Sequence, residues 1–366
     1  MARLIALASL LLALGSSVGQ EKKDGSEPNG TAEQKALANL KSKGAQMQRI
    51  EPKTSGQTGA PYWNGYFGHT SQISDADLEH LKQIKNLKSL GISSSLVTEQ
   101  GLAKLADLAN LEKLFIDSQI VSERGVDKLA DIKTLERLTF TNGKGANIRG
   151  VGFERFGRLE KLSYLSLERL PISDEGLKGL KEAKHLAYLN LSETNVTDEG
   201  LVSLKALPRL EHLNLTKTKV TDAGMVELVG LPTFKSLLLA NTAIGNEGVK
   251  VLSGNKTLAG LDLTATRIDD RGLEHIQDFK SLTSVSLMNT GISDEGLKHL
   301  QKSKLTSLRL AFANNDKITD KGLGYLEELK TLKDLFVQIQ GTKVTAEGLQ
   351  RLQKALPELK IFSGKK

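Results

Sequence analysis

The feature that most constrains this chain is a leucine-rich phrase that returns with a period of 24 residues. Copies that begin at Leu186, Leu210 and Leu282 read LAYLNLSETNVTD, LEHLNLTKTKVTD and LTSVSLMNTGISD. An Ile or Val anchor marks each unit, at Ile73, Val97, Val121, Ile148, Ile172, Val196, Val220, Ile244, Ile268, Ile292, Ile318 and Val344. Such self-similarity is the signature of a solenoid, in which each unit packs only against its neighbours. The 366 residues therefore predict one array of about twelve units instead of several globular domains.

Each unit contains a strand signal followed by a helix signal. The LxxLxL segment alternates, as expected of a short strand that is buried on one side and stacked about 4.8 Å from parallel neighbours. A phrase of Ile or Val, Ser or Thr, and Asp-x-Gly follows, for example from Ile172 to Gly176. Its Ser or Thr can cap a helix, and its Asp lies at the positive end of the helix dipole. The predicted fold class is therefore α/β.

Two further positions recur with the same period. A glycine occupies the first helical turn, at Gly101, Gly125, Gly176, Gly200, Gly224, Gly248, Gly272, Gly296, Gly322 and Gly348. Because glycine costs up to about 1 kcal/mol against alanine in a helix, we expect a common steric cause, a close backbone approach between turns. A threonine precedes the anchor by two residues, at Thr194, Thr218, Thr242, Thr266, Thr290 and Thr342. We expect these buried hydroxyls to tie successive turns together.

The two ends of the chain differ from the repeats. Arg3, a short apolar run and small residues before Gln20 predict a cleaved secretory signal, and hence a secreted or periplasmic protein. No apolar run approaches the roughly 20 residues that a membrane span needs. The predicted organisation is a signal peptide at 1–19, a linker at 20–30, an N-terminal cap at 31–72, leucine-rich repeats at 73–343 and a C-terminal capping repeat at 344–366.

An aromatic cluster, YWNGYFGH, opens the array at Tyr62. In the repeat frame counted back from Ile73, Trp63 and Tyr66 occupy the first two leucine positions of a strand. We interpret the cluster as a degenerate first repeat whose large side chains seal the open end of the core, because terminal repeats are atypical. The alternative interpretation is an aromatic cage for a ligand.

Composition and motifs exclude several kinds of site. The absence of cysteine excludes disulfides, zinc–thiolate centres and cysteine nucleophiles. The net charge is +7, but aromatic residues make up only 4% of the chain, which argues against nucleic acid as a partner and leaves an anionic polymer open. No HExxH, GxSxG or GxGxxG motif occurs, and the recurring acidic pairs are explained by helix capping. We therefore predict no enzyme activity, metal or cofactor.

A row of larger side chains marks the candidate binding site. The residue before the second leucine of each strand should stack on its equivalents in adjacent repeats, at Lys113, Arg137, Tyr164, Tyr188 and His212. A second row runs beside it, through Phe115, Thr139, Ser166, Asn190 and Asn214. Arg and aromatic anchors near polar groups are typical of recognition surfaces. A weaker patch contains Arg309, Phe312 and Phe336. The alternative is that these positions tolerate any residue.

These phrases resemble leucine-rich repeat proteins over about residues 63–362. The ITDxGL-like phrase is similar to the cysteine-containing and ribonuclease-inhibitor-like class, while the spacing and the Thr or Ser in place of Cys are closer to secreted bacterial members. The resemblance implies a curved horseshoe with parallel strands on the concave face, helices on the convex face, and a role in recognition without a fixed partner.

We therefore predict a non-enzymatic secreted recognition protein that binds a protein or peptide on the concave face between Lys113 and His212. The alternative is a structural component of the cell envelope or a binder of anionic polysaccharide. Sensitivity to salt separates the two, because polymer binding through net charge is screened more strongly.

Overall fold

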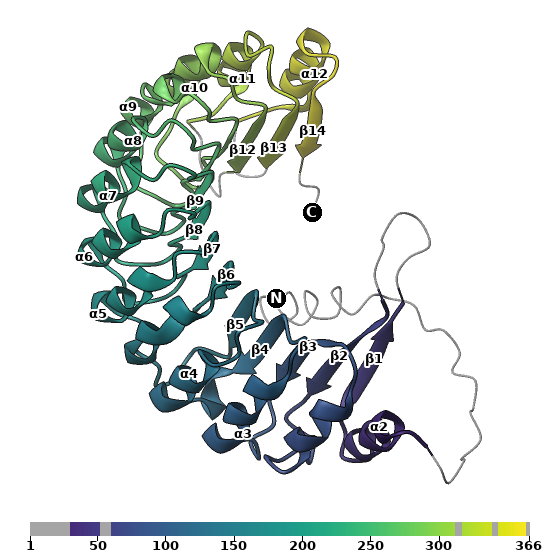
Figure 1. Ribbon diagram of the computed structural model, residues 1–366. Helices are drawn as coiled ribbons and strands as arrows, with labels where there is room; N and C mark the ends of the chain where they lie inside the picture. The colour runs from purple at the N-terminus through teal and green to yellow at the C-terminus, as the bar shows by residue number, and fades with distance from the viewer. Residues whose placement is uncertain (1–29, 52–59, 312–316, 339–342, 364–366) are drawn as a thin grey trace.

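The structure, a computed structural model, describes residues 30–51, 60–311, 317–338 and 343–363. The described strands form one 14-stranded sheet in which neighbours in sequence are neighbours in space. Figure 1 shows this sheet along the inner side of an open arc, with the helices on the outer side. The predicted α/β solenoid with a concave sheet is confirmed. The predicted signal peptide, the linker up to residue 29, Phe312 and Thr342 lie outside the described residues.

The strands are short, and many consist of only three residues. They are β1 (Gln46–Ile50), β2 (Tyr62–Phe67), β3 (Leu87–Ile92), β4 (Lys113–Asp117), β5 (Arg137–Thr141), β6 (Tyr164–Ser166), β7 (Tyr188–Asn190), β8 (His212–Asn214), β9 (Ser236–Leu238), β10 (Gly260–Asp262), β11 (Ser284–Ser286), β12 (Ser307–Ala311), β13 (Asp334–Gln338) and β14 (Lys360–Ser363). All neighbours pair in parallel except β1 and β2, which are antiparallel.

The outer side mixes α-helices with 3-10 helices. The α-helices are α2 (Ala32–Ser42), α3 (Glu99–Lys104), α4 (Glu123–Leu129), α5 (Asp174–Lys178), α6 (Asp198–Leu201), α7 (Val226–Val229), α8 (Asn246–Leu252), α9 (Asp270–Leu273), α10 (Asp294–Lys298), α11 (Asp320–Leu326) and α12 (Ala346–Ala355). The 3-10 helices are η1 (Asp77–Gln83), η2 (Leu105–Asp107), η3 (Ser118–Ile120), η4 (Val151–Arg158), η5 (Gly179–Glu182), η6 (Val202–Ala206), η7 (Asp222–Met225), η8 (Ile276–Asp278) and η9 (His299–Lys302).

The leucines of the repeat form a continuous core between the sheet and the helices. Leu114, Leu138 and Leu165 pair directly across β4, β5 and β6, and each is fully buried. The same register continues along the sheet, so the second leucine of each strand lies beside the second leucine of the neighbouring strands. Burial of apolar surface contributes roughly 25 cal/mol per Å², and these stacked leucines are therefore the main stabilising element.

A helix and a strand close the first end of the core. Thr31 Oγ1 accepts a hydrogen bond from Gln34 N at 3.2 Å, and Gln34 Oε1 accepts from Thr31 N at 2.7 Å, so a capping box begins α2. Gly44 has φ +86°, a left-handed conformation that ends the helix and leads into β1. Strand β1 was not predicted, because its sequence QMQRI lacks the repeat pattern.

The aromatic cluster lies in β2, but one expected position was wrong. Trp63 pairs with Leu87 at the first leucine position, as predicted, and packs partly buried against the core. A register shift after Trp63 then places Gly65 opposite Leu90, at the second leucine position. Tyr66 therefore points to the concave face instead of sealing the core.

The recurring glycines have a steric cause, but side chains supply it. At eight of the ten positions a Cβ would collide with the Oδ1 atom of an Asp or Asn from the preceding repeat. Only at Gly176 does the predicted backbone approach occur, against the carbonyl of Arg149. In a representative pair, Asp198 accepts hydrogen bonds from Thr221 N at 2.8 Å and from Thr221 Oγ1 at 2.6 Å. The Asp thus links one repeat to the helix start of the next.

The same carboxylate link recurs along much of the convex side. It joins Asp75 to Thr98, Asp174 to Thr197, Asp198 to Thr221, Asp270 to Ser293, Asp294 to Thr319 and Asp320 to Thr345. Hydrogen bonds to a charged acceptor contribute about 1.5–3 kcal/mol each. This Asp–Thr ladder, more than helix propensity, explains why short helices persist in these repeats.

The buried threonines act within a repeat, which corrects the expected role. Thr194 Oγ1 donates to Leu191 O at 2.7 Å and Thr218 Oγ1 to Leu215 O at 2.6 Å, three residues earlier in the same turn. Successive turns are joined nearby by backbone bonds instead. The N–H of Glu193, which has φ +56°, donates to the carbonyl of Thr216 in the next repeat at 2.8 Å.

Candidate functional site

The concave row predicted from the sequence is in register. Lys113 pairs with Arg137, Arg137 with Tyr164, Tyr164 with Tyr188, and Tyr188 with His212. Parallel strands lie about 4.8 Å apart, so side chains at these positions are close enough to stack. Because the opposite face of each strand is filled by the leucine core, this row can only face the open side of the arc.

Four of these side chains form a continuous stack. The Arg137 guanidinium carbon lies 3.8 Å from the centre of the Tyr164 ring. The rings of Tyr164 and Tyr188 are 4.2 Å apart and tilted by only 8°, and His212 follows at 6.1 Å and 37°. Cation–π and aromatic pairs each contribute about 0.5–1.5 kcal/mol beyond burial. The stack therefore holds its side chains in one geometry before any ligand arrives.

The middle of the stack is the most desolvated part. Burial, and then the neighbouring Tyr164 hydroxyl, raises the pKa of Tyr188 to about 12. The hydroxyl therefore stays protonated at any physiological pH. It can donate a hydrogen bond to a ligand while the ring offers an apolar surface.

The second row is partly committed to the fold. Asn190 is buried: its Oδ1 accepts from Ser192 N at 3.0 Å, and its Nδ2 donates to Ser166 Oγ at 3.3 Å. Asn214 Oδ1 accepts from Thr216 N at 2.9 Å in the same kind of turn. These amides shape the turn after the strand, whereas Phe115 lies half-buried on the concave face.

Charged residues form a row in the turns that follow β6, β7 and β8, and the sequence analysis did not identify this row. Arg169 Nε donates to Glu193 Oε2 at 3.2 Å, and Lys217 Nζ donates to Glu193 Oε1 at 3.1 Å. Burial opposes ionisation of Glu193, but hydrogen bonds from Arg169 and Lys217 hold its pKa below the usual value. The three residues are spaced by 24 positions with alternating charge, which is the signal that would have revealed them.

The weaker patch lies at the other end of the arc. The Arg309 guanidinium carbon is 4.6 Å from the centre of the Phe336 ring. Phe336 in turn stacks on Phe362 at 4.5 Å, a residue that the sequence analysis did not assign. This patch repeats the arginine-on-aromatic arrangement of the main stack on a smaller scale.

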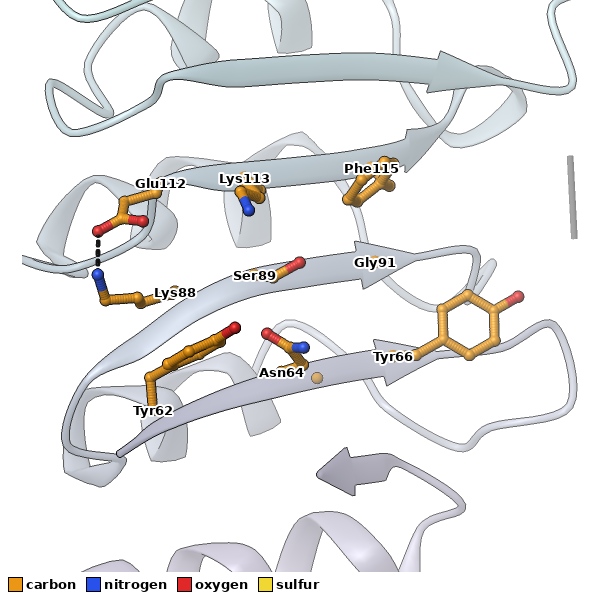
Figure 2. A pocket seen from close by; sticks show the side chains of 10 residues that line it. Tyr62, Asn64, Tyr66, Lys88, Ser89, Gly91, Glu112, Lys113 and Phe115 are labelled. Atoms are coloured by element: carbon orange, nitrogen blue, oxygen red, sulfur yellow. Dashed lines mark hydrogen bonds and ion pairs between the residues drawn. The ribbon is translucent and has the colours of Figure 1, made fainter. Parts of the chain in front are cut away.

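A hollow of about 210 Å³ opens at the first end of the concave face. Figure 2 shows the residues that line it, which come from β2, β3, β4 and the residue before β4: Tyr62, Asn64, Gly65, Tyr66, Lys88, Ser89, Gly91, Glu112, Lys113 and Phe115. Asn64 and Ser89 continue the row that leads through Lys113 to the stack, and Tyr66 and Gly91 continue the row of Phe115. Part of the cluster interpreted as an end seal, including Tyr62 and Tyr66, therefore lines an open surface, whereas Trp63 packs against the core.

In the part of the chain that the structure describes, no group of three or more His, Asp or Glu side chains is arranged to hold a metal ion. None of the described helices combines the length and the apolar character needed to cross a bilayer.

Comparison with known proteins identifies the type of repeat and the fold. A family described as Leucine Rich repeat matches residues 182–205, 207–229 and 280–300. An internalin from Listeria monocytogenes is similar in structure, with a TM-score of 0.56 and 17% identity over 81% of this chain and 91% of that one. The mouse RP105/MD-1 complex contains a chain with a TM-score of 0.54 and 18% identity over 81% of this chain. Our chain spans only 54% of that one.

No curated protein sequence matched the chain. The family model matches three of the repeats, and the fold is that of a leucine-rich repeat solenoid. Such folds commonly serve as scaffolds for protein binding, because the curved array offers an extended concave surface.

Proposed function

We propose that this protein is a secreted, non-enzymatic recognition protein that binds a protein or peptide partner on its concave face. The observation that carries the proposal is the Arg137–Tyr164–Tyr188–His212 stack, which is in register and faces the open side of the arc. Rigid aromatic and arginine anchors supply most of the energy in many protein interfaces. Beyond His212 the same row becomes Ser236, Gly260 and Ser284, so the anchors are confined to one segment.

The structurally similar proteins support a role of the curved array in binding. The mouse structure is a complex of RP105 with MD-1, and the internalin is similar to this chain in fold. Pre-organised side chains lose little entropy on binding, so a stack already formed in the free protein favours a tight complex.

Affinity capture with paired variants tests the proposal. Tyr188→Ala removes the centre of the stack and should reduce capture of a partner from native extract at least about tenfold, as expected for a hot-spot residue. Tyr325→Ala on the convex helix α11 is the matched control and should leave capture unchanged. Circular dichroism verifies that both variants fold. Equal capture by the Tyr188→Ala and wild-type proteins would refute the site.

Ionic strength separates a peptide partner from an anionic polysaccharide. Capture that depends on the aromatic stack should lose only part of its affinity between low and moderate salt. Binding of a polymer through net charge should collapse over the same range, because exposed charges are screened within about 8–10 Å. Such a collapse, unaffected by Tyr188→Ala, would favour polysaccharide binding over the proposed function.

A further inference from the structure

An unusual pairing of like charges lies where the hollow, lined by Lys113, meets the aromatic stack, which begins at Arg137. Lys113 and Arg137 lie directly opposite each other on β4 and β5. Like charges at such positions destabilise a sheet unless an anion lies between them. Among the described residues neither side chain forms an ion pair, although Arg137 stacks on Tyr164. The surface therefore presents two cations that lack an anionic partner.

A buried amide in the same row is also unsatisfied. Asn64 is only 8% exposed, and its Oδ1 accepts no hydrogen bond from the described residues. An unpaired buried acceptor costs about 1–3 kcal/mol. Figure 2 shows the Asn64 side chain between those of Tyr62 and Tyr66, on the side of β2 that faces the hollow. A side-chain amide carries one acceptor and two donors, which is the pattern needed to bind a peptide group.

The walls of the hollow are aromatic and are kept open by glycine. A Cβ at Gly91 would lie 2.7 Å from Cδ2 of Tyr66, so only glycine lets this ring lie against β3. Lys88 is engaged elsewhere, since its Nζ lies 2.5 Å from Glu112 Oε1 and 5.7 Å from the centre of the Tyr62 ring. That ion pair neutralises the one carboxylate of the hollow, so Lys113 determines the charge that a ligand meets.

Resting on the proposed function, we infer that this hollow binds the carboxylate of the peptide that the aromatic stack holds. Lys113, with Arg137 beside it, forms an ion pair with the carboxylate. The Asn64 side-chain amide forms hydrogen bonds with the adjoining peptide group, and its Oδ1 accepts from the peptide N–H. The carboxylate belongs either to the C-terminus of the peptide or to an acidic side chain. From Lys113 to His212 the row spans four strand spacings, about 19 Å, which an extended segment of about six residues covers.

Binding of defined peptide pools tests the inference. The probes are acetylated nonapeptides of neutral residues with a free C-terminus, the same pool with a C-terminal amide, and the amidated pool carrying one Glu. We expect immobilised wild-type protein to retain one of the two carboxylate pools about tenfold better than the neutral pool, since each factor of ten corresponds to about 1.4 kcal/mol. The pool that is retained identifies the source of the carboxylate. Equal retention of all three pools would overturn the inference.

Variants separate this subsite from the stack. Lys113→Ala should abolish the preference for a carboxylate, whereas Lys128→Ala, an exposed lysine in the last turn of α4, should preserve it. If wild-type protein retains all pools equally and Tyr188→Ala abolishes this retention, the stack is supported as the binding site and the carboxylate subsite is wrong. If Lys113→Ala abolishes retention and Tyr188→Ala does not, the subsite stands and the proposed stack is wrong.

A second readout uses the single tryptophan. Trp63 packs against the core, between the lining residues Tyr62 and Asn64 in β2, so its fluorescence reports on movement of this strand when a ligand binds in the hollow. The retained peptide pool should change this emission in wild-type protein and leave it unchanged in the Lys113→Ala variant. If an oligogalacturonate produces the change and the peptides do not, the ligand is a polysaccharide and the inference is overturned.

Discussion

Replacement of Gly224 by alanine tests whether the Asp–Thr ladder holds neighbouring repeats together. Helix propensity alone predicts that Gly224→Ala stabilises the protein by about 1 kcal/mol. The structure predicts the opposite sign. The added Cβ would overlap Asp198 Oδ1 and lie 2.8 Å from Cδ1 of Leu201. The carboxylate would have to move away and lose its two hydrogen bonds to Thr221.

The size of the effect follows from these bonds. Two hydrogen bonds to a charged acceptor at the lower end of their range, less the gain in helix propensity, leave a net destabilisation of about 2 kcal/mol. Urea unfolding followed by circular dichroism measures it as a lower midpoint at an unchanged slope. Gly230 is the matched control, because it lies in the same repeat with φ −82° and has open space where a Cβ would be.

The comparison can refute the reasoning directly. Gly230→Ala should leave the midpoint unchanged or raise it. If Gly224→Ala behaves in the same way, the ladder contributes nothing. A double-mutant cycle gives a second check: once Asp198→Ala has removed the carboxylate, Gly224→Ala should cost much less than it does in wild-type protein.

Two further predictions concern the stack and the buried threonines. The pKa of Tyr188 is raised to about 12, against 10.0 for a free tyrosine, so the contribution of its protonated hydroxyl to stability is fully present below pH 10 and is lost as the pH rises through 12. Tyr188→Phe should therefore remove this part of the decline in the urea midpoint at alkaline pH. An unchanged decline in this variant would contradict the assignment. Thr218→Val removes the hydrogen bond to Leu215 O and should lower the free energy of unfolding by about 1 kcal/mol. The hydroxyl of Thr216 makes no hydrogen bond with the described residues, so Thr216→Val should leave the stability unchanged. Equal urea midpoints for the two variants would contradict the role of the buried hydroxyl.

Much of the candidate site was predictable because the constant length of the repeat shows which residues occupy equivalent positions. Once the leucines are aligned, the residue before the second leucine must stack on its equivalents, and the stacking of Tyr164 on Tyr188 follows. The hollow was not predictable in this way. It depends on a one-residue shift after Trp63, which moves Tyr66 to the concave face, and no periodic signal marks that shift.

The sequence by itself determined the architecture, because a 24-residue period leaves each apolar stripe no partner except the next repeat. It also determined which positions face the core and which face the open side. Only the tertiary structure decided what the recurrent polar residues do. An Asp reaches the helix start of the next repeat and a Thr bonds within its own, since the curvature of the array sets which backbone groups lie within reach of each side chain.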